Sequence, residues 1–316
     1  MEGHDESEVD SSFTSSLEKM NVTVESLTLL EVDAVPDDAK ALIINAPTSD
    51  FSEDDAQKVI DYLDAGGKVL ITTTFETTDD MTNFNSILAE FNLEVKPGLV
   101  VENDTSMYYQ YAYYLLPDVG SADETADVDG YIFAPYMQAV ASTGESDELT
   151  YLSLLSTSDD AYVKADVANS DTLSQEADDE SGEFDVAANV ANSTTGGEIT
   201  VVTSAYIFTD EADEIVSGEN LALFNGIAEQ LIADAEEEET EDEDTEDSSA
   251  TDEETVEETD EDSDSTVVSI PVKDYTVDTL TVSQLAIVVG GLIVVIIIPL
   301  VLIILGVFIW IRRRRV

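Results

Sequence analysis

The carboxyl end of the chain constrains its architecture more than any other segment. Residues 285–311 are 27 apolar or uncharged residues in a row, with Trp310 close to the end. Four arginines follow: Arg312, Arg313, Arg314 and Arg315. As a helix the run would be about 40 Å long, enough to cross a hydrocarbon core of about 30 Å with some tilt. Trp310 fits an interfacial position, and the arginines favour the cytoplasmic side. The sequence therefore predicts a single transmembrane helix with the large preceding domain outside the cell and the C-terminus in the cytoplasm.

The amino end carries no visible export signal. Residues 1–10 read MEGHDESEVD, with neither a basic start nor an apolar stretch, so they do not resemble a signal peptide. Two interpretations remain open. The chain is tail-anchored with its domain in the cytoplasm, against the arginine rule, or the sequence begins inside a longer protein that has an N-terminal transmembrane helix. The second is preferred, because it agrees with the arginines.

Charge divides the rest of the chain. All 71 acidic residues precede the apolar run, and 20 of them lie in residues 234–264, which contain no lysine, aromatic residue or proline. Such a segment buries too little apolar surface to offset chain entropy, so it is expected to be a disordered stalk. The predicted organisation is an exterior domain at 1–233, the stalk, a juxtamembrane segment at 265–284, the membrane helix and a basic tail at 312–316.

The composition also excludes several partners and chemistries. A net charge of −60 makes nucleic acid a poor partner for this surface, although the apolar run predicts contact with the lipid bilayer. Such acidity is also compatible with a high-salt habitat. The chain has no cysteine, which removes disulfides, thiolate catalysis and cysteine-ligated metals.

Apolar periodicity predicts an α/β fold for the exterior domain. Expected helices cover residues 11–20, 52–65 and 81–91, with Ser52 as the N-cap of the second. Expected strands cover 22–30, 41–44, 68–72 and 99–101. This alternation favours an open, mostly parallel, flavodoxin-like sheet with helices on both faces. The second half adds antiparallel elements, with short strands at 131–133, 151–155 and 161–163, a hairpin of 184–190 with 199–203, and a last helix opening at 217–220. Because such sheets normally begin with a central strand, a first strand is expected upstream.

A series of short motifs resembles the gliding-motility-type ABC transporter auxiliary proteins. They are GHDE at 3–6, IINAPTSD at 43–50, YLDAGGK at 62–68, LLSTS at 154–158, NLALFN at 220–225 and IPVK at 270–273. The resemblance implies a glutamine-amidotransferase-like exterior domain between two membrane helices, acting beside ABC permease and ATPase subunits. The chain departs from the family in having Asp5 where glycine is usual, and in lacking the first helix and strand.

Common catalytic signatures are absent from the sequence. No Walker A motif and no Gly-x-Ser-x-Gly turn occur, and the cysteine nucleophile of amidotransferases is missing. His4 is the only histidine, and it lies at a terminus where a catalytic triad is hard to build. Asp127 to Gly130 is a fragment of a calcium loop, more simply a surface turn. We therefore expect no catalytic residue, no metal ligand and no cofactor.

Two groups of residues are candidates for binding. A strand-end loop follows the strand at 41–44, where open α/β sheets bind ligands, although a plain strand–helix connection explains it as well. Its members are Asn45, Pro47, Thr48 and Asp50. Five tyrosines form a candidate docking surface, with core and edge packing as the alternative. They are Tyr108, Tyr109, Tyr111, Tyr113 and Tyr114.

The sequence favours a non-enzymatic exterior subunit of a bacterial ABC transport system. A surface ligand-binding protein that works alone is the first alternative, and a degenerate hydrolase is the second. Gly290, Gly291 and Pro299 would let the membrane helix pack closely against a permease or kink, or they are ordinary membrane-helix composition.

Overall fold

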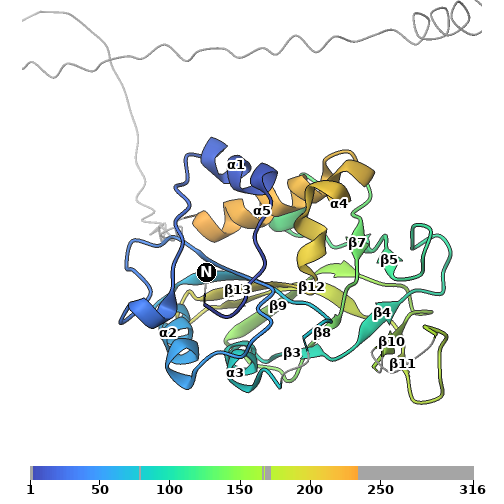
Figure 1. Ribbon diagram of the computed structural model, residues 1–316, viewed down its shortest axis with the longest axis horizontal. Coiled ribbons are helices and arrows are strands. Elements are labelled where there is room, and N and C mark those ends of the chain that lie inside the picture. Colours follow the sequence, from blue (N-terminus) through green and yellow to red (C-terminus); the bar gives the residue numbers. More distant parts are fainter. Residues whose placement is uncertain (1–2, 78–79, 166, 168–171, 234–316) are drawn as a thin grey trace, which may run out of the picture. The chain divides into compact units, whose positions relative to one another are not determined.

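Most of the expected exterior domain is defined in a computed structural model, which describes residues 3–77, 80–165, 167 and 172–233 (Figure 1). The predicted stalk, juxtamembrane segment, membrane helix and basic tail, with Trp310 and Arg312, Arg313, Arg314 and Arg315, lie outside the described residues. Among the helices that are described, none has the length and apolar character needed to span a bilayer.

A mixed sheet of eight strands organises the described residues. Its main order is β1–β2–β13–β12–β8–β3, and β9 and β6 join it through β12. The bounds are β1 Leu42–Asn45, β2 Lys68–Thr72, β3 Leu93–Lys96, β6 Asp118–Val119, β8 Ala139–Ser142, β9 Leu149–Ser156, β12 Asp185–Asn192 and β13 Glu198–Val202. Only the β1–β2 and β2–β13 pairs are parallel, and the other pairs are antiparallel.

The prediction of a mostly parallel sheet is therefore wrong, although the α/β class is confirmed. The predicted hairpin of β12 and β13 exists, but it lies in the middle of the sheet. A short turn between two strands forces them to pair antiparallel, whereas the helix between β1 and β2 provides the long crossover that parallel pairing needs. The turn also requires glycine, because a Cβ on Gly197 would lie 2.2 Å from the carbonyl oxygen of Leu63.

Helices cover both faces of the sheet, as the sequence predicted (Figure 1). Their bounds are α1 Ser11–Lys19, α2 Glu53–Asp64, α3 Thr82–Glu90, α4 Asp210–Ile215 and α5 Glu219–Ile232. Alternation along β2 explains the two cores. Leu70 points into a core shared with α1 and α5, whereas Val69 and Ile71 point into a core shared with α2 and α3. Ser52 caps α2 as expected, since its hydroxyl accepts the backbone N–H of Asp55 at 3.1 Å.

Two predicted strands do not form. The segment expected as a strand at 22–30 is irregular, and Val24 within it is 48% exposed. It leads into a 3-10 turn, Leu29–Glu31, in which Leu29 is buried. The strand expected at 131–133 is replaced by a side-chain clamp. Asn220 accepts the N–H of Phe133 at 3.0 Å and donates to its carbonyl oxygen at 2.8 Å, which satisfies the backbone without a neighbouring strand.

Smaller sheets flank the main one. The strand β4, Leu99–Val101, pairs antiparallel with β10, Tyr162–Lys164, and β10 pairs with β11, Glu180–Ser181. A two-stranded sheet joins β5, Tyr114–Leu115, to β7, Ala134–Pro135. The strand predicted at 99–101 thus forms, but outside the parallel part of the fold.

The end of α5 is tied to an interior strand of the sheet by Lys68, the first residue of β2. Its ammonium group donates to the carbonyl oxygens of Gln230 at 2.7 Å and Ala233 at 3.4 Å, and it lies 3.4 Å from the carboxylate of Glu198 on β13. A lysine that binds the last carbonyls of a helix also interacts favourably with the helix dipole.

Candidate functional site

The strand-end loop begins at the carboxyl end of β1, where Asn45 is buried and fully hydrogen-bonded. Its amide nitrogen donates to the carbonyl oxygen of Ser7 at 2.9 Å, and its amide oxygen accepts from the hydroxyl of Thr72 at 2.6 Å. Pro47 is buried beside it. Both polar ends of Asn45 are therefore used by the chain itself.

Residues 4–7 cover the strand-end loop and bind its backbone. The backbone N–H groups of Thr48 and Ser49 both donate to the carbonyl oxygen of His4, at 3.2 and 3.1 Å. The Thr48 hydroxyl donates to the carbonyl oxygen of Asp5 at 3.1 Å, and the N–H of Ser7 donates to the carbonyl oxygen of Asn45 at 2.8 Å. The donors that a ligand would meet at this strand end are bound to the N-terminal segment.

Asp50 caps a helix that follows it by thirty residues. Its carboxylate accepts the backbone N–H groups of Asn83 at 3.1 Å and Phe84 at 2.9 Å, and also that of Phe51 at 2.9 Å. Met81, at the N-cap position of α3, provides no side-chain bond. A carboxylate at this place satisfies free N–H groups and complements the helix dipole, so Asp50 joins α3 to the loop.

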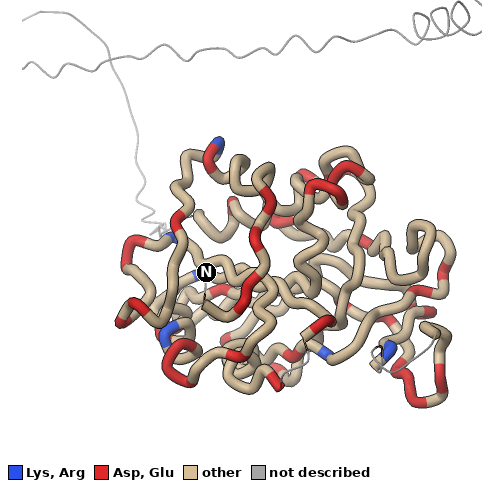
Figure 2. Tube along the Cα trace, viewed as in Figure 1, with Lys and Arg blue, Asp and Glu red and all other residues tan. Residues whose placement is uncertain are grey.

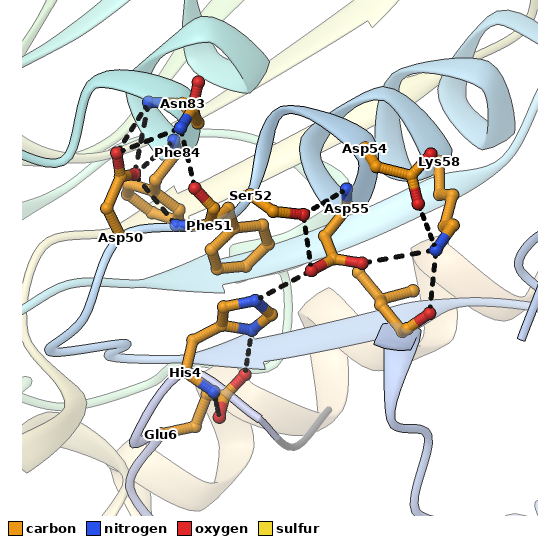
Figure 3. A network of polar contacts seen from close by, with 11 residues as sticks. His4, Glu6, Asp50, Phe51, Ser52, Asp54, Asp55, Lys58, Asn83 and Phe84 are labelled. Atoms are coloured by element: carbon orange, nitrogen blue, oxygen red, sulfur yellow. Dashed lines mark hydrogen bonds and ion pairs between the residues drawn. The ribbon is translucent and has the colours of Figure 1, made fainter. Parts of the chain in front are cut away.

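His4 is buried beneath the same loop, although it lies close to the N-terminus (Figure 3). Its ring stacks on Phe51 with centroids 3.9 Å apart. One ring nitrogen, Nδ1, lies 3.2 Å from Glu6 Oε1, and the other, Nε2, lies 3.4 Å from Asp55 Oδ2. The only histidine of the chain is thus held between two carboxylates.

The arrangement around His4 does not reproduce a nucleophilic triad. In a triad the histidine stands between the hydroxyl and the carboxylate. Here the hydroxyl of Ser52 donates to Asp55 Oδ2 at 2.8 Å, so the carboxylate stands between the hydroxyl and the histidine. Ser52 is also the N-cap of α2. The group serves to attach the N-terminal segment to α2.

Asp55 is held in its ionised form. Burial alone would raise the pKa of its carboxyl, but hydrogen bonds from Ser52, Lys58 and His4 more than offset burial, and the pKa lies below its ordinary value. Lys58 reaches Asp54 at 2.7 Å and Asp55 at 3.3 Å, and the bond to Asp54 is the largest influence that raises its pKa.

The tyrosines of residues 108–114 belong to a larger group of aromatic rings. Four rings follow one another in a stack, which we call the aromatic ladder: Phe75, Tyr136, Tyr113 and Tyr111. Successive centroids lie 5.7, 5.5 and 5.5 Å apart, and successive ring planes are inclined by 22°, 20° and 13°. The ladder begins just beyond the carboxyl end of β2 and ends at Tyr111, which is 53% exposed.

Among the remaining tyrosines of the predicted docking surface, Tyr114 contacts the ladder, whereas Tyr108 and Tyr109 contact other residues. Tyr114 packs edge-on against Tyr111, Tyr113 and Tyr136, and its hydroxyl lies 3.1 Å from that of Tyr136. Tyr109 packs edge-on against Phe133, and Tyr108 forms a backbone bridge with Leu115. The predicted group therefore combines exposed and packed residues.

Three members of the aromatic group could not be found from the local sequence. Phe75 follows β2, Tyr136 follows β7, and Tyr206 lies in the 3-10 turn Ala205–Phe208 that follows β13. Tyr206 packs edge-on against Tyr136 and donates its hydroxyl to Glu76 at 3.0 Å. Tyr136 has a left-handed backbone, with φ of 58°, a strained conformation for a bulky residue.

Three tyrosines of this group have a pKa raised above the ordinary value. The bond to Tyr114, followed by burial, raises the pKa of Tyr136. Burial raises the pKa of Tyr113, and burial with the neighbouring Glu76 raises the pKa of Tyr206. The ladder therefore offers neutral rings and hydroxyl donors.

Other candidate features hold less chemistry. A surface hollow of about 570 Å³ lies beside β8 and β9, lined in part by Phe91, Asn92, Ser142 and Tyr151. The turn from Asp127 to Gly130 is fixed by a bond from the N–H of Asp129 to Glu219 at 3.0 Å. Within the residues that the structure describes, no group of three acidic or histidine side chains is placed to hold a metal ion.

Comparison with known proteins identifies a family. Residues 11–226 match the family described as "Domain of unknown function (DUF4350)". No curated protein matches the chain. A solved structure described as "mmIFT52 N-terminal domain" is 20% identical, with a TM-score of 0.49, and the alignment covers 69% of this chain and 89% of that one. Because the family match spans well over half of the chain, the protein belongs to the DUF4350 family of domains of unknown function.

Proposed function

We propose that the protein is a non-enzymatic exterior subunit of a bacterial ABC transport system, anchored by residues 285–311 and held off the membrane by residues 234–264. The order of short motifs that resembles the gliding-motility-type auxiliary proteins supports this role. A glutamine-amidotransferase-like exterior domain belongs to the same proposal.

The closed strand-end loop is the observation that carries the non-enzymatic part. Open α/β sheets bind their substrates at the carboxyl ends of parallel strands. At the end of β1, Asn45, Thr48 and Asp50 are bound to residues 4–7 and to α3. A loop whose polar groups are bound to the fold leaves few of them for a substrate, which favours a domain that acts by binding a partner.

Capture of the partner tests the proposal. Membranes containing the affinity-tagged full chain would be solubilised in mild detergent, and the retained proteins identified by mass spectrometry. We expect an ABC permease and its ATPase in fixed ratio to the chain. A tagged chain that elutes alone from native membranes, at a level where other ABC complexes survive, would contradict the auxiliary role.

The orientation has its own test. Protease added to intact spheroplasts should remove the acidic domain from the full-length gene product, because the arginines after residue 311 favour the cytoplasm. Complete protection of the domain, with digestion after lysis as the control, would place it on the other side of the membrane.

A surface protein that binds a ligand alone is the second candidate. The hollow of about 570 Å³ beside Tyr151 favours it, because its volume suits a small molecule. Absence of the permease from the captured material would support this candidate. A degenerate hydrolase would instead show turnover that is lost in Asn45→Ala.

A further inference from the structure

We infer that the aromatic ladder, together with Glu76, is a docking surface for an arginine-bearing segment of a protein partner. The ladder runs from the end of β2 to the surface, and it combines stacked neutral rings with a carboxylate. The inference rests on the proposed auxiliary function only for which protein supplies the segment.

The exposure of the ladder separates it from a core cluster. The outermost ring of the ladder, Tyr111, is 53% exposed, and two further tyrosines of the aromatic group, Tyr109 and Tyr206, are 42% and 40% exposed. Among the described residues, Tyr131 is the one other exposed aromatic residue. In a hydrophobic core the outermost ring would be covered by another element. Exposed aromatic residues gathered on one surface mark an interaction site.

The backbone around the ladder is held in an unusual conformation. Tyr136, in the middle of the stack, has a φ of 58°, and Gln110, beside Tyr111, has a φ of 61°. Left-handed conformations of residues other than glycine persist only where the surroundings enforce them. Packing of Tyr136 between Phe75 and Tyr113 provides this constraint, so the ring faces are set in advance of binding.

Charge selects the occupant. The chain has a net charge of −60, and acidic residues are spread over the outside of the described part (Figure 2). Glu76 is exposed and joins the ladder through the Tyr206 hydroxyl at 3.0 Å. The one cation placed over a ring within the described residues is Lys96 over Phe184, outside the ladder. The ladder thus has aromatic faces and a carboxylate but no cation of its own.

Arginine fits this combination better than lysine or an apolar side chain. Its planar guanidinium stacks on a tyrosine face and still donates hydrogen bonds in its plane to a carboxylate or a hydroxyl. An apolar side chain would desolvate the Glu76 carboxylate without bringing a cation to balance its charge.

The test measures binding of a defined peptide to the full chain in detergent. The probe is a fluorescent octapeptide of alternating arginine and serine, and its control has citrulline in place of arginine, with the same shape and no charge. Binding is followed by fluorescence anisotropy at physiological salt, where attraction to distant charges is largely screened. We expect the arginine peptide to bind at least about tenfold more tightly than the citrulline peptide.

Matched variants locate the site. Tyr111→Leu should weaken binding of the arginine peptide about tenfold, whereas Tyr111→Phe, which retains the ring, should stay within about threefold. Tyr131→Leu is the control, since Tyr131 is 69% exposed and belongs to no ladder contact. None of these three changes alters the net charge, so attraction to the acidic surface as a whole is constant.

A second pair tests the carboxylate without changing the packing. Glu76→Gln should weaken binding about threefold, and Glu211→Gln on α4, an equal change of charge at another exposed position, should leave it unchanged. Equal loss in Tyr111→Leu and Tyr131→Leu, or equal binding of the citrulline and arginine peptides, would overturn the inference.

The two proposals fail separately. If an ABC permease co-purifies with the chain but Tyr111→Leu and Tyr131→Leu bind the arginine peptide equally well, the auxiliary role stands and the docking surface falls. If the peptide results hold but no permease is captured, the surface stands and the auxiliary role falls.

Discussion

The strand-end loop after β1 and the aromatic ladder after β2 begin at neighbouring parallel strands, yet they use their side chains in opposite ways. In the loop, the side chains of Asn45 and Asp50 form hydrogen bonds with other parts of the chain. In the ladder, the stack ends at Tyr111 in solvent. At the carboxyl edge of one sheet, the side chains after one strand can therefore be bound within the fold while those after the next strand reach solvent. Polar residues in the sequence are a poor guide to which of the two strand ends can bind a partner.

The largest expected effect on stability is at the strand-end loop. Asp50→Ala should lower the free energy of unfolding by about 2 kcal/mol, because three backbone N–H groups lose their acceptor and α3 loses its cap. Urea denaturation followed by circular dichroism would measure it. Glu53→Ala, on the exposed first turn of α2, is the control. A loss below about 0.5 kcal/mol would mean that the loop is not tied to α3 in solution.

The buried carboxylate beside His4 should make stability depend on pH. Asp55→Asn should cost about 1–2 kcal/mol at pH 7, through weaker bonds to Ser52, Lys58 and His4. The pKa of Asp55 is lower in the folded protein than its ordinary value of 3.8. The ionised carboxylate therefore contributes fully to stability well above pH 3.8, and this contribution is lost as the pH falls through the folded pKa. The difference between the two proteins should therefore shrink below about pH 4. A difference that stays constant down to pH 3 would show that the charge is not involved.

The smallest expected effect on stability is at the aromatic ladder. Tyr111→Leu should change the free energy of unfolding by less than about 0.5 kcal/mol, because the ring is mostly exposed. The same denaturation experiment measures it alongside Asp50→Ala. A loss as large as that of Asp50→Ala would make the ladder a structural element, and the contrast between the two regions would disappear.

The sequence predicted what depends on neighbouring residues and missed what depends on distant ones. The N-cap at Ser52 and the hairpin of β12 and β13 were readable, since each is completed within a few residues. The prediction of a strand at 22–30 was wrong because a strand also needs a neighbouring strand to pair with, and the residue pattern within the segment does not indicate one. The hairpin was recognised, but its place at the centre of the sheet was not, so the sheet was expected to be mostly parallel.

The candidate sites show the same limit. The pattern after β1 correctly marked a strand end, but whether Asn45 faces a ligand or Ser7 depends on where the N-terminal segment lies. The tyrosines at 108–114 were visible as a group, whereas Phe75, Tyr136 and Tyr206 come from three other segments. A signal that would have helped is the aromatic residue that follows a parallel strand, since such residues converge at one edge of a sheet.

The bond between Lys68 and the end of α5 has a mechanical consequence. Tension applied to the chain beyond Ala233 acts first on the backbone of α5, and the bonds of Lys68 to the carbonyl oxygens of Gln230 and Ala233 pass part of it to β2. Lys68 opens β2, which is hydrogen-bonded along both edges, to β1 and to β13. The load therefore enters an interior strand and is shared by two rows of hydrogen bonds, where an edge strand would be peeled away one bond at a time.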